Sequence, residues 1–107
     1  MNGPIRPMAP ITSIASSGMQ AAQQRLQASA HNVANLQTAG FTRLEVVQQA
    51  RSEAGGVDAA TRRAGAVGVS LESEVVDQLA AKNAFVANAT VFRTADRMAG
   101  ALLDIHA

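Results

Sequence analysis

The chain of 107 residues contains no cysteine, tryptophan or tyrosine, and its aromatic content is only 3%. Without cysteine it has neither a disulfide framework nor a thiolate metal site. The scarcity of aromatic side chains and a net charge of +1 argue against a stacking platform or a basic surface for nucleic acid. We therefore expect no nucleic-acid partner.

Long apolar runs are also missing. Polar or charged residues interrupt each candidate before it approaches the roughly 20 apolar residues of a membrane-spanning helix. Residues 1–10 hold three prolines and one arginine, and they lack the apolar stretch of a cleavable signal peptide. We expect a flexible leader at 1–10 and no membrane span.

Residues suited to catalysis are few and scattered. His31 and His106 lie far apart in the sequence, and neither has a carboxylate at the spacing of metal ligands. The glycines form no phosphate-binding loop. We expect no catalytic residue, no metal site and no cofactor, and an enzyme is the least favoured class of function.

What the chain does have is helical periodicity. From residue 11 to about 37, apolar residues recur at steps of three and four, and glutamines fill most of the positions between them. This pattern predicts a long helix with one narrow apolar seam, formed by Ala15, Met19, Ala22, Leu26, Val33 and Leu36.

A second helix is predicted from Ser70, a good N-cap with Glu72 and Glu74 in the first turn, to about Ile105. Its apolar residues form two overlapping stripes, which one partner helix cannot cover. The stripes consist of Leu71, Val75, Leu79 and Val86, then Val91, Ala95, Met98, Leu102 and Ile105, with Phe85, Phe92 and Ala99 alongside.

Between the helices the periodicity fails. Residues 44–47 can form a short strand, and residues 53–68 are rich in alanine and glycine with almost no large apolar side chain. We expect a mobile loop here, with a weak hairpin as the alternative. The predicted fold is all-α: two long antiparallel amphipathic helices forming a coiled-coil-like hairpin, joined by a mobile loop with at most a short β element. The expected segments are a leader at 1–10, the first helix and its motif at 11–43, a loop at 44–69 and the second helix at 70–107.

Helix length leads from fold to function. Helices of roughly 27 and 35 residues are about 40 and 50 Å long, whereas a compact chain of this size has a radius of gyration near 13 Å. A thin hairpin leaves an apolar strip exposed, and this predicts contacts with other subunits. Periodicity alone leaves an ordinary alanine-rich coiled coil equally open.

The segment from His31 to Arg43 predicts how the first helix ends. Gly40 suits a left-handed cap, Phe41 can fold back onto the last turn, and Asn35 and Thr38 can satisfy exposed backbone groups. The pair Asn32 and Asn35 either caps the helix or fixes the register of packed helices. We favour Asn35 in the cap and Asn32 nearer a subunit contact.

This segment resembles the N-terminal motif of the flagellar rod and hook family of axial proteins. The matching residues are Asn32, Ala34, Asn35, Thr38, Gly40, Phe41 and Arg43. Residues 82–98, followed by Leu102 and Leu103, are similar to the C-terminal segment of the same family. The likeness is greatest to the short rod proteins of the proximal-rod type, although His31 and Ala39 depart from the usual motif.

The resemblance implies a structural subunit of the bacterial flagellar basal-body rod that polymerises through its terminal helices. The implied partners are other rod subunits, of the same or different kinds, and the flagellar type III export apparatus. The implied location is the periplasmic rod, reached without a cleaved signal peptide. We expect packing in the assembly to use Leu26, Val33, Leu79, Phe85, Asn88, Val91, Phe92, Ala95, Met98, Leu102 and Ile105.

A second class of function fits the same helices. A soluble helical adaptor, or an export or assembly factor, would bind one partner helix in the exposed apolar groove. Such a protein is folded as a monomer or dimer at low concentration, whereas a rod subunit gains helix on association.

Overall fold

The computed structural model describes residues 11–52 and 55–106, and for residues 105 and 106 it describes the backbone only. The element order is helix, strand, strand, helix: α1 (Ile11–Ala34), β1 (Thr42–Ala50), β2 (Val57–Val67) and α2 (Leu71–His106). The predicted leader at 1–10 lies outside the described residues. No helix in the described part of the chain combines the length and the apolar character that a membrane span needs.

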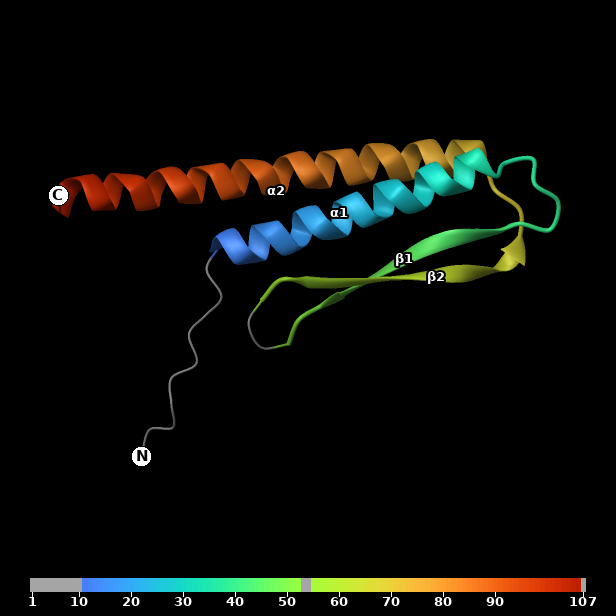
Figure 1. Ribbon diagram of the computed structural model, residues 1–107, viewed down its shortest axis with the longest axis horizontal. Coiled ribbons are helices and arrows are strands. Elements are labelled where there is room, and N and C mark those ends of the chain that lie inside the picture. Colours follow the sequence, from blue (N-terminus) through green and yellow to red (C-terminus); the bar gives the residue numbers. More distant parts are fainter. Residues whose placement is uncertain (1–10, 53–54, 107) are drawn as a thin grey trace, which may run out of the picture.

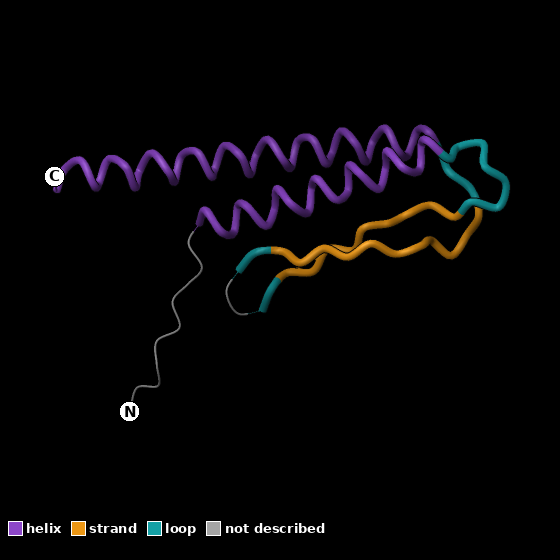
Figure 2. Tube along the Cα trace, viewed as in Figure 1, coloured by secondary structure: helices purple, strands orange, loops and turns teal. Residues whose placement is uncertain are grey.

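The all-α prediction is wrong, because the segment between the helices folds as a two-stranded antiparallel hairpin (Figure 2). Leu44 pairs with Arg63 and Ala50 with Val57, and the register shifts between Thr42 and Leu44. The strands have 9 and 11 residues, longer than the short β element that the prediction allowed. Strand β2 carries mostly alanine and arginine, so its sequence gives little of the apolar alternation that marks a strand.

Side chains of α1 hold the hairpin in place. The Ser17 hydroxyl accepts a hydrogen bond from the Val57 amide at 3.0 Å, and Gln24 donates to the Thr61 hydroxyl at 2.8 Å. At the far end of the hairpin, the Arg51 amide donates to the Gly56 carbonyl at 3.0 Å. Gly56 there has a φ of 97°, a conformation that other residues rarely adopt.

Helix α1 lies between α2 on one side and the hairpin on the other (Figure 1). Small side chains fill both contacts, so the three layers can approach closely. The buried small residues are Ala15, Ser17, Ala21, Ala22, Ala28, Ser29 and Ala81. Of the seam predicted for α1, Ala15 and Ala22 are buried, whereas Leu26 and Leu36 are exposed.

The molecule is long and thin, as the helix lengths predict. Its radius of gyration is 18.4 Å and its extents are 61 × 36 × 14 Å. Helix α2 has 36 residues and α1 has 24, so the C-terminal turns of α2 extend past the first turn of α1 (Figure 1). The N-terminus of α2 is capped by Ser70, whose hydroxyl accepts a hydrogen bond from the Ser73 amide at 3.4 Å.

Candidate functional site

A buried polar network joins α1, β1 and α2, and Asn32 is its centre. Asn32 is 0% exposed. Its amide oxygen accepts a hydrogen bond from the Leu44 amide at 2.6 Å, and its amide nitrogen donates to the Leu44 carbonyl at 2.9 Å. The side chain therefore pairs with the start of β1 as a neighbouring strand would, and it binds the hairpin to the end of α1.

The second half of the network comes from the first turns of α2. Glu74 is also 0% exposed. Its carboxylate oxygen Oε1 accepts hydrogen bonds from Asn32 at 3.1 Å and from Arg43 Nε at 2.9 Å. The backbone carbonyl of Glu74 accepts a further bond from the Ser29 hydroxyl at 3.1 Å. The other carboxylate oxygen, Oε2, has no hydrogen-bond partner among the described residues.

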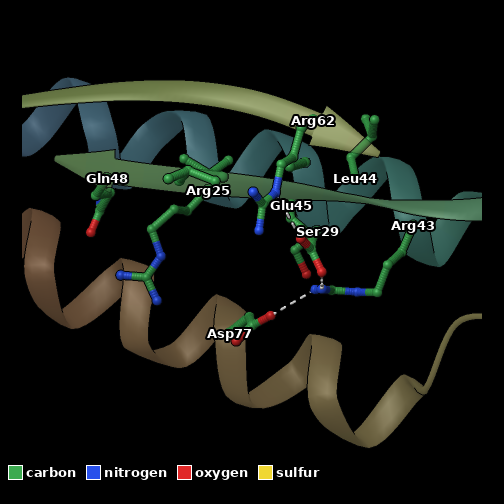
Figure 3. Close-up of a pocket in the computed structure, with 11 residues that line it drawn as sticks. Arg25, Ser29, Arg43, Leu44, Glu45, Gln48, Arg62 and Asp77 are labelled. Atoms are coloured by element: carbon green, nitrogen blue, oxygen red, sulfur yellow. Dashed lines mark hydrogen bonds and ion pairs between the residues drawn. The ribbon is translucent and has the colours of Figure 1, made fainter. Parts of the chain in front are cut away.

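Arg43 neutralises this buried carboxylate. It also donates to Asp77 at 3.0 Å, across the groove between β1 and α2 that Figure 3 shows. Desolvation lowers the pKa of Arg43, but the hydrogen bond and charge of Glu74 and the charges of Asp77 and Glu45 outweigh this effect and raise it. The guanidinium therefore stays charged.

This arrangement fixes the positions of α1, β1 and α2 relative to one another. Removing one partner of a buried ion pair leaves the other charge uncompensated, which typically costs about 3–5 kcal/mol. Asn32 and Arg43 come from the sequence motif, but Leu44, Glu74 and Asp77 were not predicted to take part. Glu74 was interpreted only as a favourable charge at the helix N-terminus, because nothing local in the sequence indicates a partner 42 residues away.

The rest of the motif forms the exit from α1. The Asn35 side chain donates to the His31 carbonyl at 2.9 Å, at the end of the helix. Phe41 folds back so that its ring centroid lies 5.6 Å from that of His31, and the Arg63 guanidinium lies 5.2 Å from the Phe41 ring centroid. Ala34 is the last residue of α1 and is exposed.

Gly40 lies six residues beyond the end of the helix, in a turn, and not at the helix cap itself. The turn is closed by a hydrogen bond from the Phe41 amide to the Thr38 carbonyl at 3.3 Å. Gly40 is the third of the four residues of this turn, and its φ of 73° is the conformation that a type II turn requires at that position. The turn directs the chain from α1 into β1.

We expect Gly40→Val to destabilise the protein by about 1–2 kcal/mol, the usual cost of a left-handed backbone for a residue with a Cβ. Space is not the cause, because nothing lies within 4 Å of an added Cβ there. Gly65→Val is the matched control, since Gly65 has the same open surroundings without a positive φ. Urea denaturation compares the two, and an equal effect would contradict the turn assignment.

The residues predicted to pack in the assembly fall into two groups. Asn88 and Ala95 of α2 and Val33 of α1 are half-buried within the chain. The side chain of Ile105 lies outside the described residues. The other side chains are exposed despite their apolar character: Leu26, Leu79, Phe85, Val91, Phe92, Met98 and Leu102.

The exposed apolar residues lie along most of α2. A shallow apolar groove follows the contact between α1 and α2, lined by Ala22, Gln23, Leu26, Ala81, Lys82, Phe85 and Val86. Beyond the first turn of α1, Leu102 and Leu103 are 60% and 71% exposed. Soluble monomers rarely leave so many large apolar side chains of one helix exposed, so α2 is a candidate interaction surface.

Two family matches cover the elements that carry these features. Residues 13–42 match the family described as "Flagella basal body rod protein", and they include nearly all of α1 and the motif as far as Thr42. Residues 65–105 match the family described as "Flagellar basal body rod FlgEFG protein C-terminal", which here comprises the end of β2 and nearly all of α2. No curated protein matches the chain. The two matches occur in the order that the sequence motifs predict, and the chain belongs to the flagellar basal-body rod family.

Proposed function

We propose that this chain is a structural subunit of the flagellar rod that polymerises through α1 and α2. The observation that carries the proposal is the row of exposed apolar side chains on α2, which continues beyond the reach of α1. Burial of apolar surface is the main favourable term in protein association. The subunit gains this term only when other subunits cover α2.

The polar network has a defined part in this proposal. It ties the N-terminus of α2, the end of α1 and the start of the hairpin together, so these elements meet a neighbour as one rigid unit. The export route through the type III apparatus and the periplasmic location belong to the same proposal and derive from the family.

We expect Leu102→Asp to prevent incorporation into the rod. Leu102 is 60% exposed in the single chain, so the variant should keep its helix content and stability. In an assembly, the new carboxylate would be buried without a partner, at a cost of several kcal/mol at every copy. Basal bodies isolated from cells that produce the variant should lack the chain, and motility should be lost.

Ala101→Asp is the matched control. It places the same charge one residue away, between Arg97 and Asp104, on a side of α2 that already carries charges. We expect this variant to be incorporated. If Leu102→Asp enters the basal body as the wild type does, the polymer interface lies elsewhere. If it instead unfolds the free chain, Leu102 belongs to an internal core and the helical adaptor becomes the better proposal.

A further inference from the structure

Two surfaces on α2 consist of residues with the same spacing along the helix. The first, the receiving surface, consists of Lys82, Phe85, Val86 and Ala89, and its first three residues line the apolar groove against α1. The second, the end surface, consists of Asp96, Ala99, Gly100 and Leu103, near the C-terminus of the helix. Each set has the i, i+3, i+4, i+7 pattern of a single helix stripe.

Each residue of the end surface lies fourteen positions after its counterpart in the receiving surface. Fourteen residues make two heptads, the repeat that keeps positions on the same face of packed parallel helices. At a rise of 1.5 Å per residue, the two surfaces are about 21 Å apart along the helix. A second α2 that is parallel and shifted by this distance brings the end surface of one copy onto the receiving surface of the other.

At this offset the side chains are complementary in size. Phe85 meets Ala99, and Val86 meets Gly100, so each large side chain faces a small one. The relation reverses one turn later, where Leu103 meets Ala89. Alternating large and small residues let helices interdigitate without voids.

The charges are complementary as well. Lys82 of one copy meets Asp96 of the other, and both residues are exposed in the single chain. Packing of the same two helices without an offset would instead place lysine on lysine and aspartate on aspartate, and Phe85 on Phe85. Like charges in contact are unfavourable, so the charge pattern selects the offset arrangement.

Gly100 supports the same arrangement independently. It lies inside α2, where glycine is about 1 kcal/mol less favourable than alanine. Nothing in its own chain lies within 4 Å of an added Cβ, so no contact in the described structure requires a glycine there. The side chain of Val86 from a second copy would fill that space.

We propose that the end surface of one subunit docks onto the receiving surface of a second copy of this chain, with the two α2 helices parallel and offset by about 21 Å. The contact joins two different surfaces of the chain, so it is heterologous and relates the two copies by a shift along α2. This inference rests on the proposed rod function and specifies which faces of the subunit meet.

Gly100→Leu separates this docking contact from a structural role in the monomer. In the single chain, the substitution improves helix propensity and has open space, so the thermal midpoint should stay the same or rise. Self-association, measured by sedimentation of the purified full chain over a range of concentrations, should be lost. Ala101→Leu, at the neighbouring exposed position, should associate as the wild type does. Equal association of the two variants would overturn the proposal.

Charge reversal tests the register. Lys82→Asp and Asp96→Lys should each raise the concentration needed for association by about tenfold or more, since each variant brings like charges together. The double variant should return to near the wild-type value, because the ion pair is restored in reverse. No recovery in the double variant would contradict the offset.

Two further outcomes would overturn the proposed docking contact. A wild-type chain that stays monomeric at high concentration excludes a second copy as the occupant, and a different rod subunit then has to cover the groove. A symmetric dimer, in which both copies bury the same surface, overturns the offset arrangement. Neither result affects the proposed rod function, which depends on the incorporation of Leu102→Asp and Ala101→Asp into basal bodies.

Discussion

Replacing Asn32 with Asp should unfold the junction of α1, β1 and α2. The substitution keeps the shape of the side chain but removes the two hydrogen bonds that its amide nitrogen donates, to the Leu44 carbonyl and to Glu74. It also buries a new carboxylate next to Glu74, which is 0% exposed and has one oxygen without a partner among the described residues. We expect a loss of about 3 kcal/mol or more, in the range for breaking buried charged networks.

The matched control is Asn35→Asp, three residues further along. The Asn35 side chain makes two exposed hydrogen bonds: it donates to the His31 carbonyl and accepts from the Thr38 hydroxyl at 3.2 Å. Asn35→Asp removes only the donated bond, so it should cost about 1 kcal/mol or less. Urea denaturation gives the two stability changes. Hydrogen exchange at the Leu44 amide, which donates to Asn32 at 2.6 Å, shows whether β1 separates from α1. Similar effects of the two substitutions would mean that the network does not hold the junction together.

The second large effect is expected at Gly18, where α1 and α2 approach closely. A Cβ added to Gly18 would lie 2.6–2.7 Å from the side-chain atoms of Asn88, closer than such atoms come in real structures. The Asn88 amide is itself held by a hydrogen bond to the Ala84 carbonyl at 2.8 Å. Gly18→Leu should therefore push the helices apart and destabilise the protein by about 2–3 kcal/mol, typical of an overpacked contact.

A compensating change tests whether the contact with Asn88 is the cause. Asn88→Ala shortens the side chain that Gly18→Leu meets, so the double variant should recover at least 1 kcal/mol of the loss, a coupling typical of residues in contact. Asn83→Ala, at an exposed position on α2, should give no recovery. Thermal unfolding of the single and double variants measures the coupling free energy between positions 18 and 88. Purely additive effects would show that the cost at Gly18 arises elsewhere.

Local patterns were enough to predict the two helices and the elongated shape. Helix α2 begins at Leu71 after the expected cap, Ser70, and ends at His106, within one residue of the expected end. Helix propensity, capping and the spacing of apolar residues are properties of neighbours in the sequence, so they can be read before the chain is folded. The prediction for the end of α1 is less accurate, because α1 stops at Ala34 and the motif continues as a turn.

The motif residues can be identified from the sequence, but the groups that they contact cannot. Asn32 and Arg43 belong to the sequence motif, but their partner Glu74 lies on α2, 31 residues or more away in the chain. Asn32 was expected near a subunit contact, and the structure places it inside its own chain with no exposed surface. A single asparagine in a helical pattern carries no information about which distant group it meets.

The helices, the family motif and the excess of apolar side chains on α2 can be read from local spacing and composition. The pairing of residues 42–50 with residues 57–67 in a hairpin depends on tertiary contacts. Strand β2 has few large apolar residues, and its stability comes from backbone pairing with β1 and from docking on the small residues of α1. Such pairing joins residues that are distant in sequence, and it becomes favourable only when all three layers are present.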